Sequence, residues 1–198
     1  MIVDLLRHGE PLGGVRYRGH GIDDPLSDRG WRQMWRAVGE SPERWPWQAV
    51  LSSPLQRCQA FAQALCERRS LPLRVVADLR EIGFGEWEGL APEVVRSERI
   101  SEYRAFLADP AAGRPPGAEP LGAFRSRVQT ALVEQCARIE AEHLLVVAHA
   151  GVVRATVGWV LQIPDPAFHR LHCGYASLTR IRRDAERGWR VEFANRGP

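Results

Sequence analysis

An apolar run ends abruptly in polar residues in the stretch Ile2-Val3-Asp4-Leu5-Leu6-Arg7-His8-Gly9-Glu10. A short, nearly continuous apolar segment that stops at a polar loop is typical of a strand buried in a parallel sheet. The stretch therefore predicts a strand over 2–6, whose carboxyl end presents Arg7 and His8 to a loop.

The same order of strand, polar loop and helix recurs further along the chain. A strand predicted over 49–51 runs into Ser52-Ser53-Pro54 and a helix over 55–69. The most apolar strand, 144–148, ends at His149, and Gly151 opens the next helix. Strands that alternate with helices predict an α/β fold, a three-layer α/β/α sandwich with a mostly parallel sheet.

The remaining segments complete this pattern. Residues 11–25 are rich in Gly and Pro and are predicted to lack regular structure, whereas Ser27 is predicted to cap a helix. Other elements are predicted at 74–77 (strand), 92–109 (a helical stretch), 110–120 (turns), 121–142 (amphipathic helix), and 178–182 and 190–193 (terminal hairpin). We expect one domain over 1–198, with a small helical cap insertion at about 90–120.

Charge and cysteine usage exclude several classes of protein. The 27 basic residues, all arginine, nearly balance the 24 acidic residues, which argues against a nucleic-acid-binding tail. Without lysine, Schiff-base chemistry and a P-loop lysine are excluded. The four cysteines form no C-x-x-C pair, and Asp4 and Arg7 interrupt the first apolar stretch. With no segment of membrane-spanning length, we expect a soluble, cytoplasmic protein that binds neither membrane nor nucleic acid.

Polar side chains follow three of the predicted strands where each strand ends. Arg7 and His8 follow the first strand, Ser53 and Arg57 the second, and His149 the fourth. Ligands of open parallel sheets bind outside the carboxyl ends of the strands, so these side chains are expected to converge. Arginine forks and imidazoles suit a phosphoryl dianion, with one imidazole placed for in-line attack. The pattern therefore predicts a phosphoryl-binding site.

Four sequence blocks carry a resemblance to a known family. They are Leu6-Arg7-His8-Gly9-Glu10, Ser52-Ser53-Pro54-Leu55 with Arg57, Glu81 ahead of Phe84-Gly85-Glu86-Trp87-Glu88-Gly89, and Ala148-His149-Ala150-Gly151. In these blocks the chain resembles the histidine phosphatase superfamily, which includes the cofactor-dependent phosphoglycerate mutases. The resemblance implies a phosphoglycerate mutase-like fold. It also implies hydrolysis of a small-molecule phosphate ester through a phosphohistidine, with no metal or other cofactor.

The resemblance further implies a role for each residue of the site. His8 would be the nucleophile, and Arg7 and Arg57 would hold the phosphoryl group. His149 would stabilise the transferring oxygens, and Glu81 would protonate the leaving oxygen.

The loop after the first strand is expected to face the substrate. In this loop Tyr17, Arg18 and Gly19 precede His20 and are expected to bind substrate. Mutases of the family carry an asparagine six residues after the nucleophile, where this chain has Gly14. One phosphate ligand is therefore missing or replaced.

Alternatives to this interpretation stay open. A mutase would share the nucleophile, and an idle relative would bind phosphorylated ligands or proteins without turnover. Hydrolysis is favoured because the segment between Glu81 and His149 is shorter than in the mutases. Residues 4–11 and 17–27 look similar to alpha-ribazole phosphatases of cobalamin synthesis, which makes alpha-ribazole 5'-phosphate a candidate substrate. The oligomeric state, monomer or homodimer, stays open.

Some residues near the predicted site have competing interpretations. Glu86 and Glu88 compete with Glu81 for the acid role, and Arg154 either reaches the phosphate or pairs with an acid. The cluster of His169, His172 and Cys173 resembles a metal site superficially, but it lacks a fourth ligand and helical spacing, so no metal is predicted. No cysteine precedes an arginine by six positions, as a cysteine phosphatase loop requires.

Overall fold

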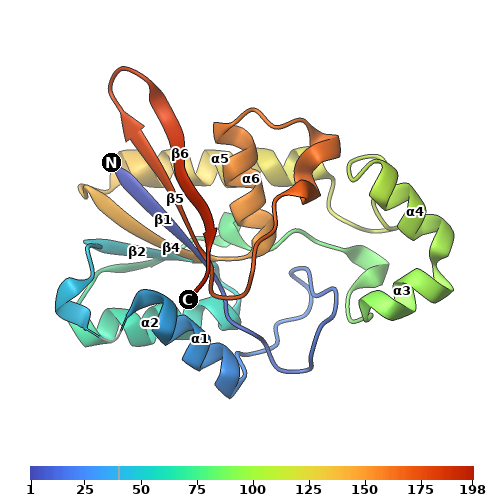
Figure 1. Cartoon of the computed structure of the whole chain (residues 1–198), viewed down its shortest axis with the longest axis horizontal. Helices are drawn as coiled ribbons and strands as arrows, with labels where there is room; N and C mark the ends of the chain where they lie inside the picture. Colours follow the sequence, from blue (N-terminus) through green and yellow to red (C-terminus); the bar gives the residue numbers. More distant parts are fainter. Residues whose placement is uncertain (40) are drawn as a thin grey trace.

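The computed structural model describes residues 1–39 and 41–198, and these fold around a six-stranded sheet of order β3-β2-β4-β1-β5-β6 (Figure 1). Its strands are β1 (Ile2–Arg7), β2 (Ala49–Ser52), β3 (Leu73–Val75), β4 (His143–Ala148), β5 (Leu178–Asp184) and β6 (Gly188–Arg196). Strands β1 to β4 run parallel to one another, β5 is antiparallel to β1, and β6 is antiparallel to β5. The predicted mostly parallel sheet and terminal hairpin are confirmed.

The parallel register brings the carboxyl ends of β1, β2 and β4 to one edge of the sheet. Arg7, the last residue of β1, lies opposite Ala148, the last residue of β4. Beyond the strands, the backbone N–H of His8 donates to the Ala148 carbonyl at 2.9 Å, and that of Ser53 donates to the Val147 carbonyl at 3.0 Å. The polar residues that follow these strands therefore leave the sheet side by side.

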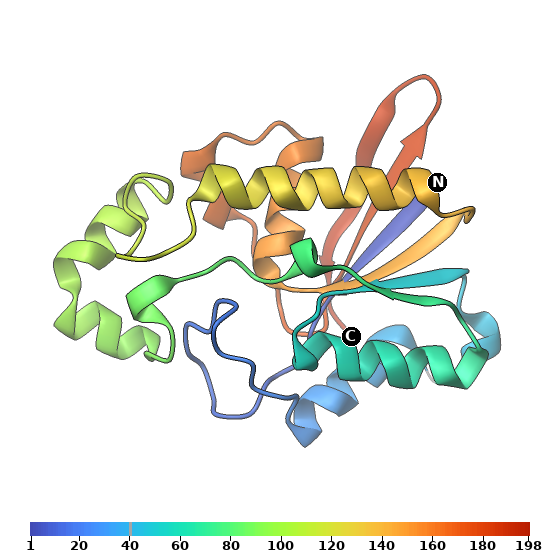
Figure 2. The same cartoon turned by 180° about the vertical axis from the view of Figure 1, so that it is seen from behind.

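Helices cover both faces of this sheet (Figures 1 and 2), as the predicted three-layer sandwich requires. On one face lie α1 (Asp28–Val38) and α2 (Gln56–Arg69), and on the other lie α5 (Leu121–Arg138) and α6 (Ala150–Val160). Successive strand residues point to opposite faces. Leu5 therefore packs in the core under α5 and α6, while Leu6 packs under α1 and α2. Ser27 caps α1 as predicted, since its side chain accepts from the N–H of Gly30.

The cap segment extends away from the end of the sheet (Figure 1). The stretch predicted to be helical over 92–109 forms two separate helices, α3 (Pro92–Glu98) and α4 (Ile100–Ala108). Arg99 breaks them with non-helical dihedrals (φ −125°, ψ 41°), and its guanidinium pairs with Glu86 and Glu102. A separate apolar cluster forms around Trp87 and Phe106.

Two other predicted boundaries differ from the structure. The strand predicted over 74–77 is Leu73–Val75, followed by the 3-10 helix Ala77–Leu79. The helix predicted to reach residue 142 ends at Arg138, because Ile139 is extended (φ −105°, ψ 118°). Further 3-10 helices lie at Pro42–Arg44, Gly85–Trp87 and Asp165–Arg170. None of the helices in the described part of the chain has the length and apolar character needed to span a bilayer.

Candidate active site

His8 leaves β1 directly into the site and is held by the backbone. Its ring Nδ1 lies 2.7 Å from the carbonyl oxygen of Gly9. A carbonyl oxygen only accepts hydrogen bonds, so Nδ1 carries the proton and Nε2 keeps its lone pair. The loop is fixed by a close approach to α1, because a Cβ at Gly9 would lie 2.3 Å from the carbonyl oxygen of Gly30. The backbone thus selects the tautomer in which Nε2 carries no proton.

Burial and nearby positive charge keep both site histidines neutral. Burial lowers the pKa of His8 well below its usual value, and the charges of Arg7 and Arg57 lower it further. The pKa of His149 is lowered in the same way, by burial first and then by Arg57. A neutral imidazole is the form that can attack phosphorus.

His149 is more deeply buried than His8. Its ring is edge-to-face with that of His8, with centroids 5.2 Å apart, and it is fully buried. Its Nε2 lies 2.7 Å from the hydroxyl oxygen of Ser53, and the thiol of Cys58 is 3.6 Å from the same nitrogen. Ser53 therefore orients the ring of His149. The sequence pattern placed Ser53 at the end of a strand near the site but gave it no role.

Arg7 is held from the opposite side by the loop of residues 171–177. Its guanidinium donates to the carbonyl oxygen of Cys173 and stacks on the ring of Tyr175, 4.1 Å from the ring centroid. Its buried Nε has no hydrogen-bond partner among the residues that the structure describes. Arg7 thus enters the site with unused donor capacity.

Arg57, in the first turn of α2, fastens the loop after β1. Its amino groups donate to the carbonyl oxygens of Ile22 (2.9 Å) and Gly19 (2.8 Å), and its side chain is 1% exposed. Its Nε, too, has no partner within the described part of the chain. Arg57 therefore both shapes the substrate loop and lines the cavity.

Arg18 is used mainly inside its own loop. It pairs with Asp24 at 2.8 Å and donates to the carbonyl oxygens of Leu12 and Gly14. Tyr17 packs instead against the rings of Phe84 and Trp87 of the cap region. Of the predicted substrate loop, Tyr17, Arg18 and Gly19 all line the cavity, but Nε and Nη2 of Arg18 already donate within the loop.

Glu81 is the carboxylate that lines the cavity. Its Oε1 accepts from the N–H of Ile82 at 3.0 Å, and its Oε2 accepts from the N–H of Gly151 at 3.2 Å. Glu88 instead accepts from the N–H groups of Gly21 and Phe84, and Glu86 pairs with Arg99. The two competing carboxylates thus stabilise loops and the cap, whereas Glu81 faces the site.

These groups enclose a polar cavity of about 160 Å³. It is lined by Arg7, His8, Arg16, Tyr17, Arg18, Gly19, Arg57, Glu81, Phe84, Ala150, Arg154 and Tyr175. The lining includes Arg154, which the sequence left open, and Tyr175, which it missed because no pattern marks that loop. His149 lies behind the lining and Gly14 outside it.

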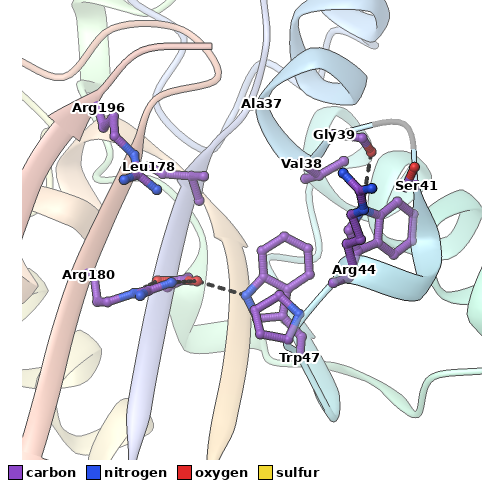
Figure 3. A pocket seen from close by; sticks show the side chains of 12 residues that line it. Ala37, Val38, Gly39, Ser41, Arg44, Trp47, Leu178, Arg180 and Arg196 are labelled. Atoms are coloured by element: carbon purple, nitrogen blue, oxygen red, sulfur yellow. Dashed lines mark hydrogen bonds and ion pairs between the residues drawn. The ribbon is translucent and has the colours of Figure 1, made fainter.

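A second cavity, of about 280 Å³, lies between the end of α1 and the hairpin β5–β6 (Figure 3). At its base the buried carboxylate of Asp4 accepts from Trp47 (2.8 Å), His143 (2.9 Å) and Arg180 (2.7 Å). The carboxylate of Asp4 and its three donors therefore satisfy one another by hydrogen bonding. The smaller cavity at His8 instead combines a neutral histidine, arginines with unused donors and a carboxylate.

The cluster of His169, His172 and Cys173 was predicted not to bind metal, and its side chains have different surroundings in the structure. The ring of His169 packs on Phe106 and Phe168, with centroids 4.8 and 5.1 Å away. Cys173 is buried, whereas His172 is exposed. Within residues 1–39 and 41–198 there is no group of three or more His, Cys, Asp or Glu residues placed to hold a metal ion.

The fold and site together define an α/β protein with a neutral histidine and several arginines at the carboxyl edge of its parallel strands. The model of the histidine phosphatase superfamily (branch 1) matches residues 3–196. The chain belongs to the histidine phosphatase superfamily.

Individual proteins are also similar to this chain. A bifunctional protein of Mycobacterium tuberculosis is 34% identical over 178 residues, which is 88% of this chain and 48% of the relative. The chain thus spans about half the length of that relative. An adenosylcobalamin/alpha-ribazole phosphatase of Salmonella typhimurium is 30% identical over 162 residues, 81% of this chain and 79% of the relative. The solved structure of a mycobacterial glucosyl-3-phosphoglycerate phosphatase is similar with a TM-score of 0.86 and 26% identity, covering 100% of this chain and 99% of that one.

Proposed function

We propose that this protein is a metal-independent phosphomonoesterase that forms a phosphohistidine on His8. The observation that carries the proposal is the bond from Nδ1 of His8 to the Gly9 carbonyl, which leaves Nε2 free. The lowered pKa of His8 supports it, because the imidazole stays neutral and nucleophilic.

The proposed reaction has two steps. In the first, the Nε2 lone pair of His8 forms a bond to phosphorus while the ester P–O bond breaks, and Glu81 gives its proton to the leaving oxygen. In the second, water attacks the phosphohistidine, Glu81 takes a proton from that water, and the P–N bond breaks to release phosphate. The second step returns the proton to Glu81 and frees Nε2 of His8, so both residues end in their starting states.

The other site residues are proposed to stabilise charge on the transferred group. Arg7 and Arg57 would donate to the phosphoryl oxygens from nearby amino groups and from their Nε atoms, which have no partner among the residues that the structure describes. His149 would stabilise the transferring oxygens, and Ser53 would determine which of its ring nitrogens carries the proton. These contacts strengthen as charge develops in the transition state.

The proposed substrate is a small phosphate ester. Alpha-ribazole 5'-phosphate is one candidate, because the Salmonella relative is named an alpha-ribazole phosphatase. Mutase-type transfer is the second candidate reaction, since it uses the same phosphohistidine. It would appear as transfer of phosphate to an added alcohol rather than to water.

Rapid quench with phosphorus-labelled substrate tests the proposal. Acid-labile, base-stable label should appear on the wild-type protein and be absent from His8→Gln. Turnover of a generic phosphomonoester should continue in excess EDTA. Label at wild-type level in His8→Gln would overturn the assignment of the nucleophile, and EDTA inhibition reversed by a divalent ion would overturn the metal-independent chemistry. A wild-type protein that binds phosphate esters but never turns them over is the idle relative.

A further inference from the structure

The loop after β1 is joined to the segment that leads into the cap. The backbone N–H of Tyr17 donates to the carbonyl oxygen of Leu90 at 2.9 Å, and the N–H of Gly89 donates to the carbonyl oxygen of Tyr17 at 2.7 Å. Residues of both segments line the cavity at His8. Two parts of the chain that lie far apart in sequence, 17–21 and 84–90, therefore form one wall of the site.

The carboxylate of Glu88 links these two segments. Its Oε1 accepts from the backbone N–H of Phe84 at 2.9 Å, and its Oε2 accepts from the N–H of Gly21 at 3.0 Å. A Cβ at Gly19 or at Gly21 would overlap this carboxylate, so the loop approaches it through bare backbone. Glu88 thus holds one side of the loop by direct contact.

The same loop orients the guanidinium of Arg57. The amino groups of Arg57 donate to the carbonyl oxygens of Gly19 at 2.8 Å and Ile22 at 2.9 Å, on either side of the Gly21 N–H that Glu88 binds. Its Nε has no partner among the residues that the structure describes. A shift of residues 19–22 would therefore move the donors that Arg57 offers to the cavity.

We propose that Glu88 is a positioning residue for Arg57, because its carboxylate fixes the loop whose carbonyl oxygens orient that guanidinium. The proposal rests on the proposed phosphatase function, in which Arg57 holds the phosphoryl group. Glu88 itself is not among the residues that line the cavity, so it acts without touching the substrate. Two N–H donors need two acceptors, and a carboxylate provides them as charge-assisted hydrogen bonds.

The sign of the effect on anion binding separates this role from simple electrostatics. Removal of a negative charge near an anion site tightens anion binding by itself, because a repulsion is lost. Displacement of the Arg57 donors weakens anion binding instead. Weaker binding after neutralisation of Glu88 therefore reports the position of Arg57.

Calorimetry of the full chain with inorganic phosphate tests the proposal. Glu88→Gln keeps the size of the side chain but replaces one acceptor with an NH₂ group, so one of the two contacts is lost. The Kd for phosphate should rise about 10-fold, the effect of losing one charge-assisted hydrogen bond. In an Arg57→Gln background, Glu88→Gln should change the Kd by less than about 2-fold.

Glu102→Gln is the matched control in the cap. The Glu102 carboxylate accepts from the indole N–H of Trp87 at 2.7 Å and from Arg99 at 3.2 Å, so its loss perturbs the cap away from residues 17–21. The Kd for phosphate should not rise in this variant. A rise equal to that of Glu88→Gln would show that any damage to the cap weakens binding, and would overturn the proposal.

The double-mutant comparison also excludes a purely structural role. If Glu88→Gln raises the Kd equally with and without Arg57, or in neither background, Glu88 does not act through Arg57 and the proposal is wrong. Urea unfolding shows whether each variant is folded. If Glu88→Gln is not, Gly21→Ala replaces it, because its Cβ displaces the carboxylate from the loop side, and the same pair of Kd values decides.

Turnover provides a second measurement. Alkyl and aryl esters share the phosphoryl group that Arg57 holds, so Glu88→Gln should slow single-turnover phosphoenzyme formation from both equally. A larger loss for the alkyl ester would make Glu88 the acid and overturn the proposal. If the wild type hydrolyses no ester but the phosphate measurements couple Glu88 to Arg57, the phosphatase function fails and the positioning role stands. If phosphohistidine forms on His8 without that coupling, the positioning role fails and the phosphatase stands.

Discussion

The carboxylate of Glu81 accepts a hydrogen bond from the backbone N–H of Gly151, the second residue of the helix that follows His149 (3.2 Å). The first turn of α6 thus orients the carboxylate of Glu81, the proposed acid, and begins directly after His149. The contact requires glycine, because a Cβ at position 151 would lie 2.1 Å from Oε1 of Glu81.

We therefore predict that Gly151→Ala displaces the Glu81 carboxylate. Phosphoenzyme formation from an alkyl phosphate should slow by about 10²-fold, the lower end of what general acid catalysis contributes. Gly158→Ala is the matched control in the same helix, since its Cβ would meet Arg125 at an ordinary 3.5 Å. In a Glu81→Ala background the Gly151→Ala substitution should cost little more; additive losses would show that the two positions act independently.

Glu81→Gln should slow poor leaving groups far more than good ones, because only a basic alkoxide needs a proton in the transition state. Single-turnover phosphoenzyme formation should fall about 10²–10⁴-fold for an alkyl phosphate and much less for an activated aryl phosphate. Glu86→Gln and Glu88→Gln are the comparison variants. If Glu81→Gln slows both substrates equally and one of those two shows the leaving-group dependence, that residue is the acid.

The pKa of His8 should respond to charge at position 57. Burial lowers this pKa and the Arg57 charge lowers it further, so Arg57→Gln should raise it toward the usual value of 6.5 while Arg29→Gln, an exposed site, should not. NMR titration of labelled histidine side chains measures both values. A His8 signal that titrates near pH 6.5 in the wild-type protein would contradict the neutral, poised nucleophile.

Acid stability should depend on Asp4. Burial alone would raise the pKa of this carboxyl, but hydrogen bonds from His143, Arg180 and Trp47 lower it from 3.8 to about 2. A folded pKa below the unfolded one stabilises the protein above about pH 4, and this contribution is lost as the pH falls through about 2.

Asp4→Asn should therefore flatten the pH dependence of the free energy of unfolding between about pH 4 and 2, by about 2 kcal/mol. Urea unfolding at each pH measures it, with the exposed Asp78→Asn as the control. If the free energy of unfolding of Asp4→Asn depends on pH as it does in the wild type, groups other than Asp4 cause the acid sensitivity.

Local pattern in the sequence was enough for the order of strands and helices and for the polar residues that follow the strands. Apolar runs that stop at Arg7, Ser52 and His149 mark where strands end, because strands buried in a parallel sheet are mostly apolar. Parallel strands leave the sheet at one edge, so the convergence of His8, Ser53 and His149 follows from chain order. The break at Arg99 could not be predicted, since its side-chain pairs with Glu86 and Glu102 form only in the folded cap.

What the sequence by itself determined about this protein is its α/β architecture and the proposed site residues, for periodicity and motif are properties of neighbours along the chain. Only the tertiary structure decided how those residues are used. It engaged Nε and Nη2 of Arg18 within its own loop, placed Glu81 rather than Glu86 or Glu88 in the cavity lining, and brought Tyr175 and Arg154 into the cavity. The physical reason is that hydrogen-bond partners and uncompensated charge depend on distances in space between segments far apart in sequence.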